Sequence, residues 1–131
     1  MNMDVYQEKA VRSTGQNILV SASAGAGKTR VLVERLIKRC LEDHVGMDEV
    51  LAVTFTAAAA AEMKNRAAKT MQERLASADD PEQAEWIRKQ MILLDSADIT
   101  TIDAFCLTII QKYCSVIGLD PATAAQVMDD A

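Results

Sequence analysis

Apolar and polar residues follow two patterns along the chain, helical spacing and short continuous apolar runs, which predict helices and strands in alternation. Between residues 28 and 42 the apolar positions recur at helical spacing, with charged residues on the opposite face. The apolar face consists of Val33, Leu36, Ile37, Cys40 and Leu41, and the polar face of Glu34, Arg35, Lys38, Arg39 and Glu42. Gly46 is placed to end this helix. The short apolar run at 17–21 indicates a buried strand, and the run at 50–56 a second strand.

The rest of the chain predicts further helices at 4–14, 57–76, 82–95 and 104–117, with a short strand at 99–102. Asp80 and Pro81 form a helix start, and Asp103 is placed to cap the last helix. The residues expected to face the core are Met63, Ala67, Met71 and Leu75, then Ala84, Ile87, Met91 and Leu94, then Phe105, Ile109, Ile110, Tyr113 and Val116 or Ile117.

Strands that alternate with helices predict an α/β fold with a short parallel sheet and right-handed crossovers. The 131 residues show no internal repeat and no shift in composition, so we expect a single domain over 1–131. No apolar run approaches the roughly 20 residues of a membrane span, and the polar start is unlike a signal peptide.

Charge and cysteine content narrow the classes of function. The net charge of −5 argues against a surface built wholly around nucleic acid, but it leaves room for a local groove. The three cysteines, Cys40, Cys106 and Cys114, form neither a disulfide framework nor a zinc pattern, so we expect them to be reduced and buried in a cytoplasmic protein. We interpret the single histidine, His44, as a surface residue.

The stretch SASAGAGKT lies between the first predicted strand and the long amphipathic helix. It matches the phosphate-loop pattern G-x-x-x-x-G-K-[ST], except that Ala22 stands at the first position. Backbone N–H groups converge on an anion where residues adopt conformations open mainly to glycine, which Gly25 and Gly27 provide. The following helix N-terminus adds N–H groups, Lys28 reaches the β- and γ-phosphates, and Thr29 offers a hydroxyl to Mg²⁺. The alternative is an ordinary small-residue turn.

At this point the sequence resembles a known family. The blocks ILVSASAGAGKTRVLVERL, VLAVTFTAAAAAEMKNR and DITTIDAFC, in this order, resemble the first motifs of superfamily 1 DNA helicases. Within that group they resemble most the AddA subunits of bacterial AddAB helicase–nucleases, which are related to UvrD, Rep and RecB. Alanine at the first loop position is usual there. The resemblance implies a three-layer, RecA-like P-loop domain, of which this chain is the N-terminal part of domain 1A.

The resemblance also implies roles for single residues. Gln7 would read the adenine edge, although an exposed helix glutamine is the simpler interpretation. The implied nucleotide-binding set is Gln7, Ala22, Ser23, Ala24, Gly25, Ala26, Gly27, Lys28, Thr29 and Arg30, with Lys28 and Thr29 catalytic and Thr29 on Mg²⁺. The implied DNA contacts are Thr54, Phe55, Thr56 and Thr101, although Phe55 also suits a core position. Ala57 and Asp103 depart from the family pattern and weaken the DNA contacts beside them.

ATP hydrolysis also needs a carboxylate pair at the end of a strand. Asp95 follows an apolar run, but that run continues a helical face and no second acid follows. We therefore expect an ATP-binding N-terminal fragment that does not hydrolyse ATP by itself. The implied parent is an ATP-dependent DNA helicase/exonuclease acting in double-strand-break repair. Its implied partners are ATP, Mg²⁺, single- or double-stranded DNA and a second, AddB-like subunit. The alternatives are a complete small P-loop NTPase or kinase that uses Asp95, and a non-enzymatic nucleotide-binding module.

Overall fold

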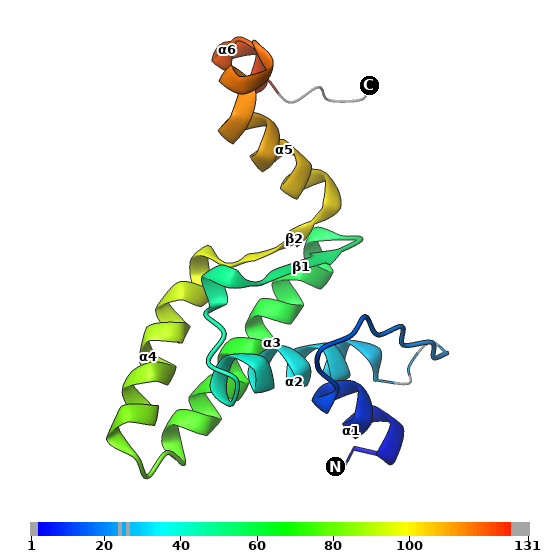
Figure 1. Cartoon of the computed structure of the whole chain (residues 1–131), viewed down its shortest axis with the longest axis vertical. Helices are drawn as coiled ribbons and strands as arrows, with labels where there is room; N and C mark the ends of the chain where they lie inside the picture. Colours follow the sequence, from blue (N-terminus) through cyan, green and yellow to red (C-terminus); the bar gives the residue numbers. More distant parts are fainter. Residues whose placement is uncertain (1–2, 24, 26, 127–131) are drawn as a thin grey trace.

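The computed structural model describes residues 3–23, 25 and 27–126. Helices make up most of this range, and a pair of helices separates the two strands of the described chain (Figure 1). In chain order the elements are α1 (Val5–Arg12), α2 (Lys28–Leu41), the 3₁₀ helix η1 (Met47–Glu49), β1 (Leu51–Thr54), α3 (Ala57–Ala76), α4 (Pro81–Ser96), β2 (Asp98–Thr101), α5 (Ile102–Tyr113), the 3₁₀ helix η2 (Cys114–Ile117) and α6 (Pro121–Ala124).

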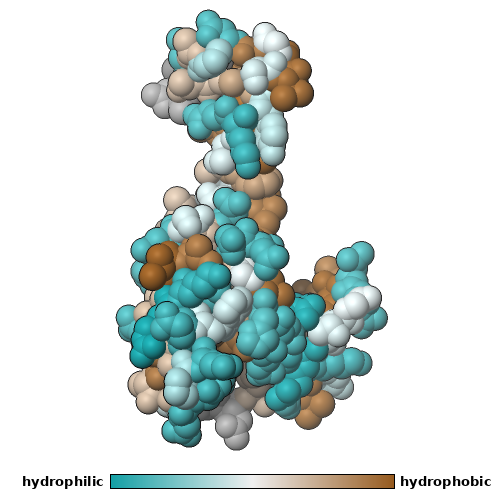
Figure 2. Space-filling model, turned by 60° about the vertical axis from the view of Figure 1, so that its left-hand side comes forward, coloured by the Kyte–Doolittle hydropathy of each residue, from teal (hydrophilic) through white to brown (hydrophobic). Residues whose placement is uncertain are grey.

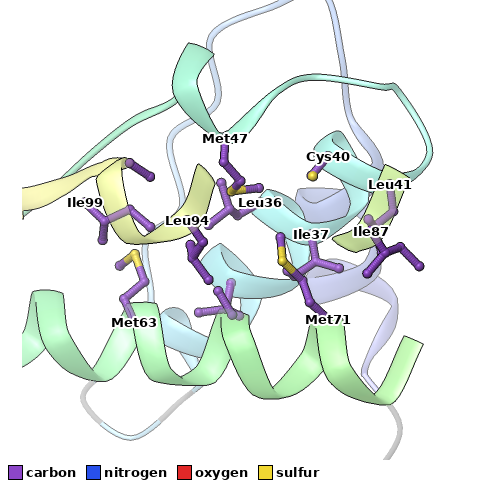
Figure 3. Packing of buried hydrophobic residues seen from close by; sticks show 13 residues of the cluster. Leu36, Ile37, Cys40, Leu41, Met47, Met63, Met71, Ile87, Leu94 and Ile99 are labelled. Carbon is purple, nitrogen blue, oxygen red and sulfur yellow. The ribbon is translucent and has the colours of Figure 1, made fainter. Parts of the chain in front are cut away.

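The core lies between α2, α3 and α4, and it uses the faces that helical spacing predicts (Figure 3). All five predicted residues of the α2 face are buried, as are Met63, Ala67 and Met71 of α3. Ile87 and Leu94 of α4 are buried opposite them, while Leu75 and Met91 are partly buried at the border. Burying a side chain the size of Met71 contributes about 1.5–3 kcal/mol, so this cluster is the main source of stability.

Side-chain caps fix where the central helices begin. The Thr56 hydroxyl accepts the Ala59 N–H at 3.1 Å at the start of α3. Asp80 accepts the Glu82 N–H at 3.2 Å, with Pro81 in the first position of α4, as predicted. The α2 helix ends at Leu41, earlier than expected, and Gly46 instead precedes η1.

A single tryptophan joins α2 to α4. The indole N–H of Trp86 donates to the Cys40 carbonyl at 2.8 Å, near the end of α2. The ring of His44 packs edge-on against it at 5.2 Å, and Lys89 Nζ lies 5.7 Å from its centre. His44 itself is exposed, as predicted. Trp86 thus supplies a donor for the Cys40 carbonyl, which lies in the last turn of α2, where carbonyls have no intrahelical partner.

In the described part of the chain, the sheet consists of β1 and β2 in parallel. The register pairs Leu51 with Asp98 and Thr54 with Thr101, so both strands end together. Helices α3 and α4 connect the two strands, which confirms the predicted α/β arrangement with a short parallel sheet. Because α3 and α5 follow the strands directly, both helices begin at the carboxyl edge of the sheet.

The predicted buried strand at 17–21 is wrong. These residues form no strand, and Leu19 is 95% exposed, while Ile18 and Val20 are also exposed. A strand needs a neighbour for its backbone N–H and C=O groups. No strand among the described residues lies beside this segment, because β1 pairs only with β2.

The predicted core face of the helix at 104–117 is also wrong. Tyr113 is 47% and Val116 78% exposed, and Ile109 and Ile110 are exposed as well. Helix α5 projects from the three-helix core and carries η2 and α6 at its far end (Figures 1 and 2). Its apolar side therefore meets little of the described chain, although Phe105 is half-buried.

Two single-residue expectations in this region are corrected. Asp103 does not cap α5, since the helix begins earlier and the Thr101 hydroxyl accepts the Ala104 N–H at 3.2 Å. Cys106 is exposed, not buried, because it lies on this projecting helix, whereas Cys40 and Cys114 are buried as expected.

Candidate functional site

The glycines of the SASAGAGKT stretch adopt the backbone conformation that such a loop requires. Gly25 has φ +80° and Gly27 has φ +82°, both in the left-handed region that favours glycine. Gly27 is also the N-cap of α2, and its carbonyl accepts the Val31 N–H at 3.0 Å. Two of the predicted loop residues, Ala24 and Ala26, lie outside the described residues.

The first turn of α2 is a positive helix end. It contains Lys28 and Arg30 and no acidic residue. Gly27 has no side chain with which to cap the helix, and the first N–H groups of any helix have no intrahelical partner. Together with the helix dipole, these groups suit a bound anion.

Lys28 folds back over the loop that precedes it. Its Nζ donates to the Ala22 carbonyl at 2.5 Å and to the Ser23 carbonyl at 3.3 Å. The ammonium is therefore held on the loop by main-chain oxygens, on an exposed side chain. A phosphate that entered the loop would offer a stronger, charge-assisted acceptor to the same group.

Gln7 lies against this loop although it is remote in sequence. It belongs to α1, where Asp4 and Gln7 form a capping box through bonds of 2.8 and 3.1 Å. A Cβ atom on Gly27 would lie only 3.4 Å from Nε2 of Gln7. The structure thus brings Gln7, Gly27 and Lys28 into one place, while Thr29 is exposed in the second position of α2.

Arg30 lines a different hollow from the one beside Lys28. It is half-buried between α2 and α3, together with Arg66 and Lys69. Lys28 instead lines a hollow with Ala10, Ile18 and other residues on the α1 side of α2. The nucleotide role of Arg30 therefore stays a prediction.

The four residues predicted to contact DNA gather at the carboxyl edge of the sheet. Thr54 and Thr101 are paired across the strands, and the Thr54 hydroxyl donates to the Thr56 carbonyl at 2.8 Å. Thr56 and Thr101 are the N-caps of α3 and α5. Phe55 is 95% exposed, so its interpretation as a core residue is wrong. Two helix N-termini and an exposed aromatic ring at one edge suit a phosphodiester strand.

Asp95 does not lie at the carboxyl edge of the sheet, where a carboxylate for ATP hydrolysis would be needed. It lies in α4, just before β2 begins, and therefore at the amino end of the sheet. Thr101 and Thr54 mark the opposite end of the strands. Within the described ranges, no three His, Cys, Asp or Glu side chains gather to hold a metal ion.

Sequence reasoning missed Arg35. The helical pattern puts it on the polar face of α2, but its guanidinium is partly buried against α1 and bonds to main-chain oxygens there. The only sequence signal is its position two helical turns after Lys28.

Comparison with known proteins bears on the whole chain. The UvrD/REP helicase N-terminal domain family matches residues 3–130. The chain belongs to this family. Similar proteins include the ATP-dependent helicase/nuclease subunits of Levilactobacillus brevis, 53% identical over 116 residues, and Bacillus anthracis, 49% identical over 117 residues. Each alignment covers 88% of this chain and 9% of the relative, so the chain spans about a tenth of the length of these relatives.

Membership of the UvrD/REP family agrees with the resemblance found in the motifs. Matches at 42–53% identity extend across several bacterial genera under the same name. None of the helices in the described part of this UvrD/REP chain is long and apolar enough to cross a membrane.

Proposed function

We propose that the chain binds the phosphates of ATP in the loop before α2. The observation that carries the proposal is the meeting of Gly27, Lys28 and Gln7. A left-handed glycine opens the helix N-terminus, an ammonium is held over the loop, and an amide lies beside both. Backbone N–H groups would bind the phosphates, Lys28 would neutralise charge on the β- and γ-phosphates, and Gln7 would select the base.

Mg²⁺ fits the same place. The Thr29 hydroxyl is an exposed hard oxygen donor at the start of α2, next to Lys28. Mg²⁺ usually takes few protein ligands and completes its shell with water and substrate phosphates, so one threonine is an adequate protein contribution. The ion would neutralise phosphate charge when it is bound. Thr29 would hold it, while Lys28 and the helix N-terminus fix the nucleotide.

The finer fold proposal is a partial P-loop, RecA-like domain with three layers. An apolar groove of about 690 Å³ runs along β1, and its lining includes Leu32, Leu51, Val53 and Met63. Leu32 also lines a second hollow against Ile18 and Val20 of the segment before the loop. The groove therefore separates that segment from β1, and we propose that further strands of the parent protein's sheet fill it.

For the parent protein we propose an ATP-dependent DNA helicase/nuclease of double-strand-break repair, cytoplasmic, which works together with a second subunit. The names of the relatives support this, as does the edge of the sheet, where Thr56 and Phe55 are exposed beside the half-buried Thr101. ATP binding would be coupled to movement along single-stranded DNA, and the nuclease centre would lie outside residues 1–131. Asp95 lies at the wrong end of the sheet for a kinase-like carboxylate, so we expect no turnover from this chain.

The test is titration with a fluorescent ATP analogue in the presence of Mg²⁺, with and without single-stranded DNA. Lys28→Ala should lose at least about tenfold in affinity, the equivalent of one charge-assisted contact. Lys89→Ala, which removes an exposed lysine from α4, is the matched control and should bind like wild type. Binding that is the same with Lys28→Ala would contradict the proposal and favour a scaffolding module.

A second measurement separates the enzyme alternatives. Asp95→Asn should leave nucleotide binding unchanged, because Asp95 lies in the last turn of α4, at the amino end of the sheet. Steady ATP turnover by the 131-residue chain that is lost in Asp95→Asn would instead establish a complete small NTPase or kinase.

A further inference from the structure

Arg35 joins the helix that carries Gln7 to the helix that carries Lys28. Its Nη1 lies 2.8 Å from the Ala10 carbonyl, 2.7 Å from the Ser13 carbonyl and 3.3 Å from the Val11 carbonyl. These three oxygens form the C-terminal end of α1, and Arg35 is separated from them by more than twenty positions in the sequence. Val11 beside them is buried, so the contact is a tertiary joint and not a surface ion pair.

The end of α1 needs this guanidinium. The last carbonyls of a helix have no intrahelical partner. The Lys9 carbonyl already accepts both the N–H and the hydroxyl of Ser13, at 3.0 and 2.7 Å. The Ala10 and Ser13 carbonyls accept the two N–H groups of Arg35 Nη1 instead, with the Val11 carbonyl sharing one of them at 3.3 Å. The positive charge of Arg35 also complements the negative end of the helix dipole.

The joint controls where Gln7 lies. Helix α1 has only eight residues, which is too short to be stable alone. Gln7 is one turn before Ala10, so docking of the α1 end on Arg35 sets the position of Gln7. Near the start of α1, Nε2 of Gln7 lies 3.4 Å from the position that a Cβ atom on Gly27 would take.

Arg35 also shares a face of α2 with Lys28. Seven residues at 100° each return to within about 20° of the same direction. Both side chains line one hollow of about 300 Å³, together with Ala10 of α1. One face of α2 thus directs Lys28 to the loop and Arg35 to α1.

We propose that Arg35 is a positioning residue for base recognition, which holds the Gln7 amide beside the phosphate loop without touching the nucleotide. This inference rests on the proposed ATP site and goes beyond it. Because Arg35 acts through Gln7 and not through the loop, its loss reduces selectivity for adenine over guanine more than it reduces phosphate binding. A residue that only stabilised the fold would weaken every ligand equally.

The test compares Arg35→Gln and Arg35→Lys with Arg39→Gln, the matched control. Arg39 lies one turn further along α2, where it bonds to Asp43 at 2.7 Å and not to α1. A thermal melt first checks that each variant is folded. Dissociation constants are then measured on folded protein for labelled ATP and labelled GTP, and for inorganic triphosphate by competition. We expect the ratio of GTP to ATP dissociation constants to fall about tenfold in Arg35→Gln, the equivalent of a lost hydrogen bond to the base.

Arg35→Lys keeps the charge but offers a single ammonium in place of the planar guanidinium, so we expect an intermediate ratio. Triphosphate binding should change less than twofold in both variants, and Arg39→Gln should behave like wild type. An unchanged ratio in Arg35→Gln and Arg35→Lys, or an equal loss for ATP, GTP and triphosphate, would overturn the inference. Wild-type chain that shows no Lys28-dependent binding would instead refute the proposed function on which it rests.

Discussion

Gln7 and Gly27 belong to separate elements, yet a single methyl group on Gly27 would come within 3.4 Å of the Gln7 amide nitrogen. The left-handed backbone of Gly27 favours glycine, whereas Gln7 would lie at ordinary van der Waals distance from the added methyl. Two effects of a substitution can thus be separated, the strain in the backbone and the direction of the N–H groups that would face an anion.

Gly27→Ala tests that separation. An alanine at φ +82° costs about 1 kcal/mol of stability, and the new Cβ would be in van der Waals contact with Gln7. We expect nucleotide affinity to fall about tenfold or more, because the N–H groups at the start of α2 turn away from the anion. Fluorescence titration and chemical denaturation measure the two effects.

Gly118→Ala is the control for this change. Gly118 has φ +70° and no described atom near its Cβ position, so it carries similar strain far from the loop. It should lose comparable stability and bind nucleotide normally. Equal affinity of both variants would contradict the role of Gly27.

Phe55→Ala is expected to weaken single-stranded DNA binding. The ring is 95% exposed, so its removal should hardly change the melting temperature. Stacking of one base on an aromatic ring contributes about 1–3 kcal/mol, which corresponds to a loss of roughly tenfold in affinity. Ile92→Ala is the control, because it removes an exposed apolar side chain elsewhere, on α4. It should have no effect on DNA binding measured by anisotropy.

The three cysteines should differ in reactivity. Cys106 is exposed, whereas burial raises the pKa of the Cys40 thiol from 9.0 to about 11. At pH 8 a thiol reagent should therefore label Cys106 first, and Cys40 only after unfolding. Rapid labelling of Cys40 in the native chain, located by mass spectrometry of the modified peptides, would show that this part of the core is open.

The same shift predicts a loss of stability in alkaline solution. The folded state holds the Cys40 proton more tightly than the unfolded state, so the contribution of Cys40 to stability is unaffected below pH 9 and declines between pH 9 and about 11. Cys40→Ala should reduce the fall in unfolding free energy between pH 9 and about 11, as measured by denaturant unfolding at a series of pH values.

Gln90→Ala is expected to destabilise the core. Gln90 is fully buried, and its Oε1 accepts the Met47 N–H at 2.8 Å, while its Nε2 has no protein partner in the described part. Truncation leaves a buried N–H without an acceptor and opens a cavity, at a combined cost of about 2–4 kcal/mol. Gln83→Ala, at an exposed position on the same helix, should change the unfolding free energy by less than about 0.5 kcal/mol.

The helices of the core could be predicted from the sequence because each has a clear apolar periodicity, and other described helices bury those faces. Met71 of α3, Ile37 of α2 and Ile87 of α4 belong to one buried cluster. Local chemistry also placed Pro81 at a helix start. Periodicity and capping are sufficient where the described chain itself supplies the burying partner.

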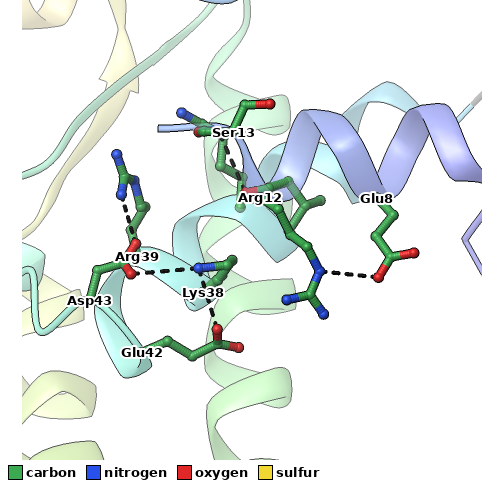
Figure 4. A network of polar contacts seen from close by, with 9 residues as sticks. Glu8, Arg12, Ser13, Lys38, Arg39, Glu42 and Asp43 are labelled. Atoms are coloured by element: carbon green, nitrogen blue, oxygen red, sulfur yellow. Dashed lines mark hydrogen bonds and ion pairs between the residues drawn. The ribbon is translucent and has the colours of Figure 1, made fainter. Parts of the chain in front are cut away.

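The same reasoning was wrong for Leu19 and Tyr113, because periodicity identifies an apolar face but not what covers it. Both side chains belong to apolar patterns, and both are exposed. Their burial would need partners that the described residues do not provide. Arg35 was missed for a related reason, since its carbonyl partners lie far away in the sequence and no local spacing indicates them. The ion pairs at the ends of α1 and α2 (Figure 4), such as Arg12 with Glu8 and Arg39 with Asp43, instead join residues four positions apart, as helical spacing indicates.

The joint between Trp86 and Cys40 has a practical consequence. Trp86 is the only tryptophan in the sequence, and its indole N–H is bonded near the far end of the helix that begins at Lys28. About 18 Å of rigid α2 separates the two sites, as twelve residues rise 1.5 Å each. The intrinsic fluorescence of the protein thus reports on the distal end of α2, and a tilt of this helix caused by a ligand at the proposed nucleotide site would be observable without any added dye.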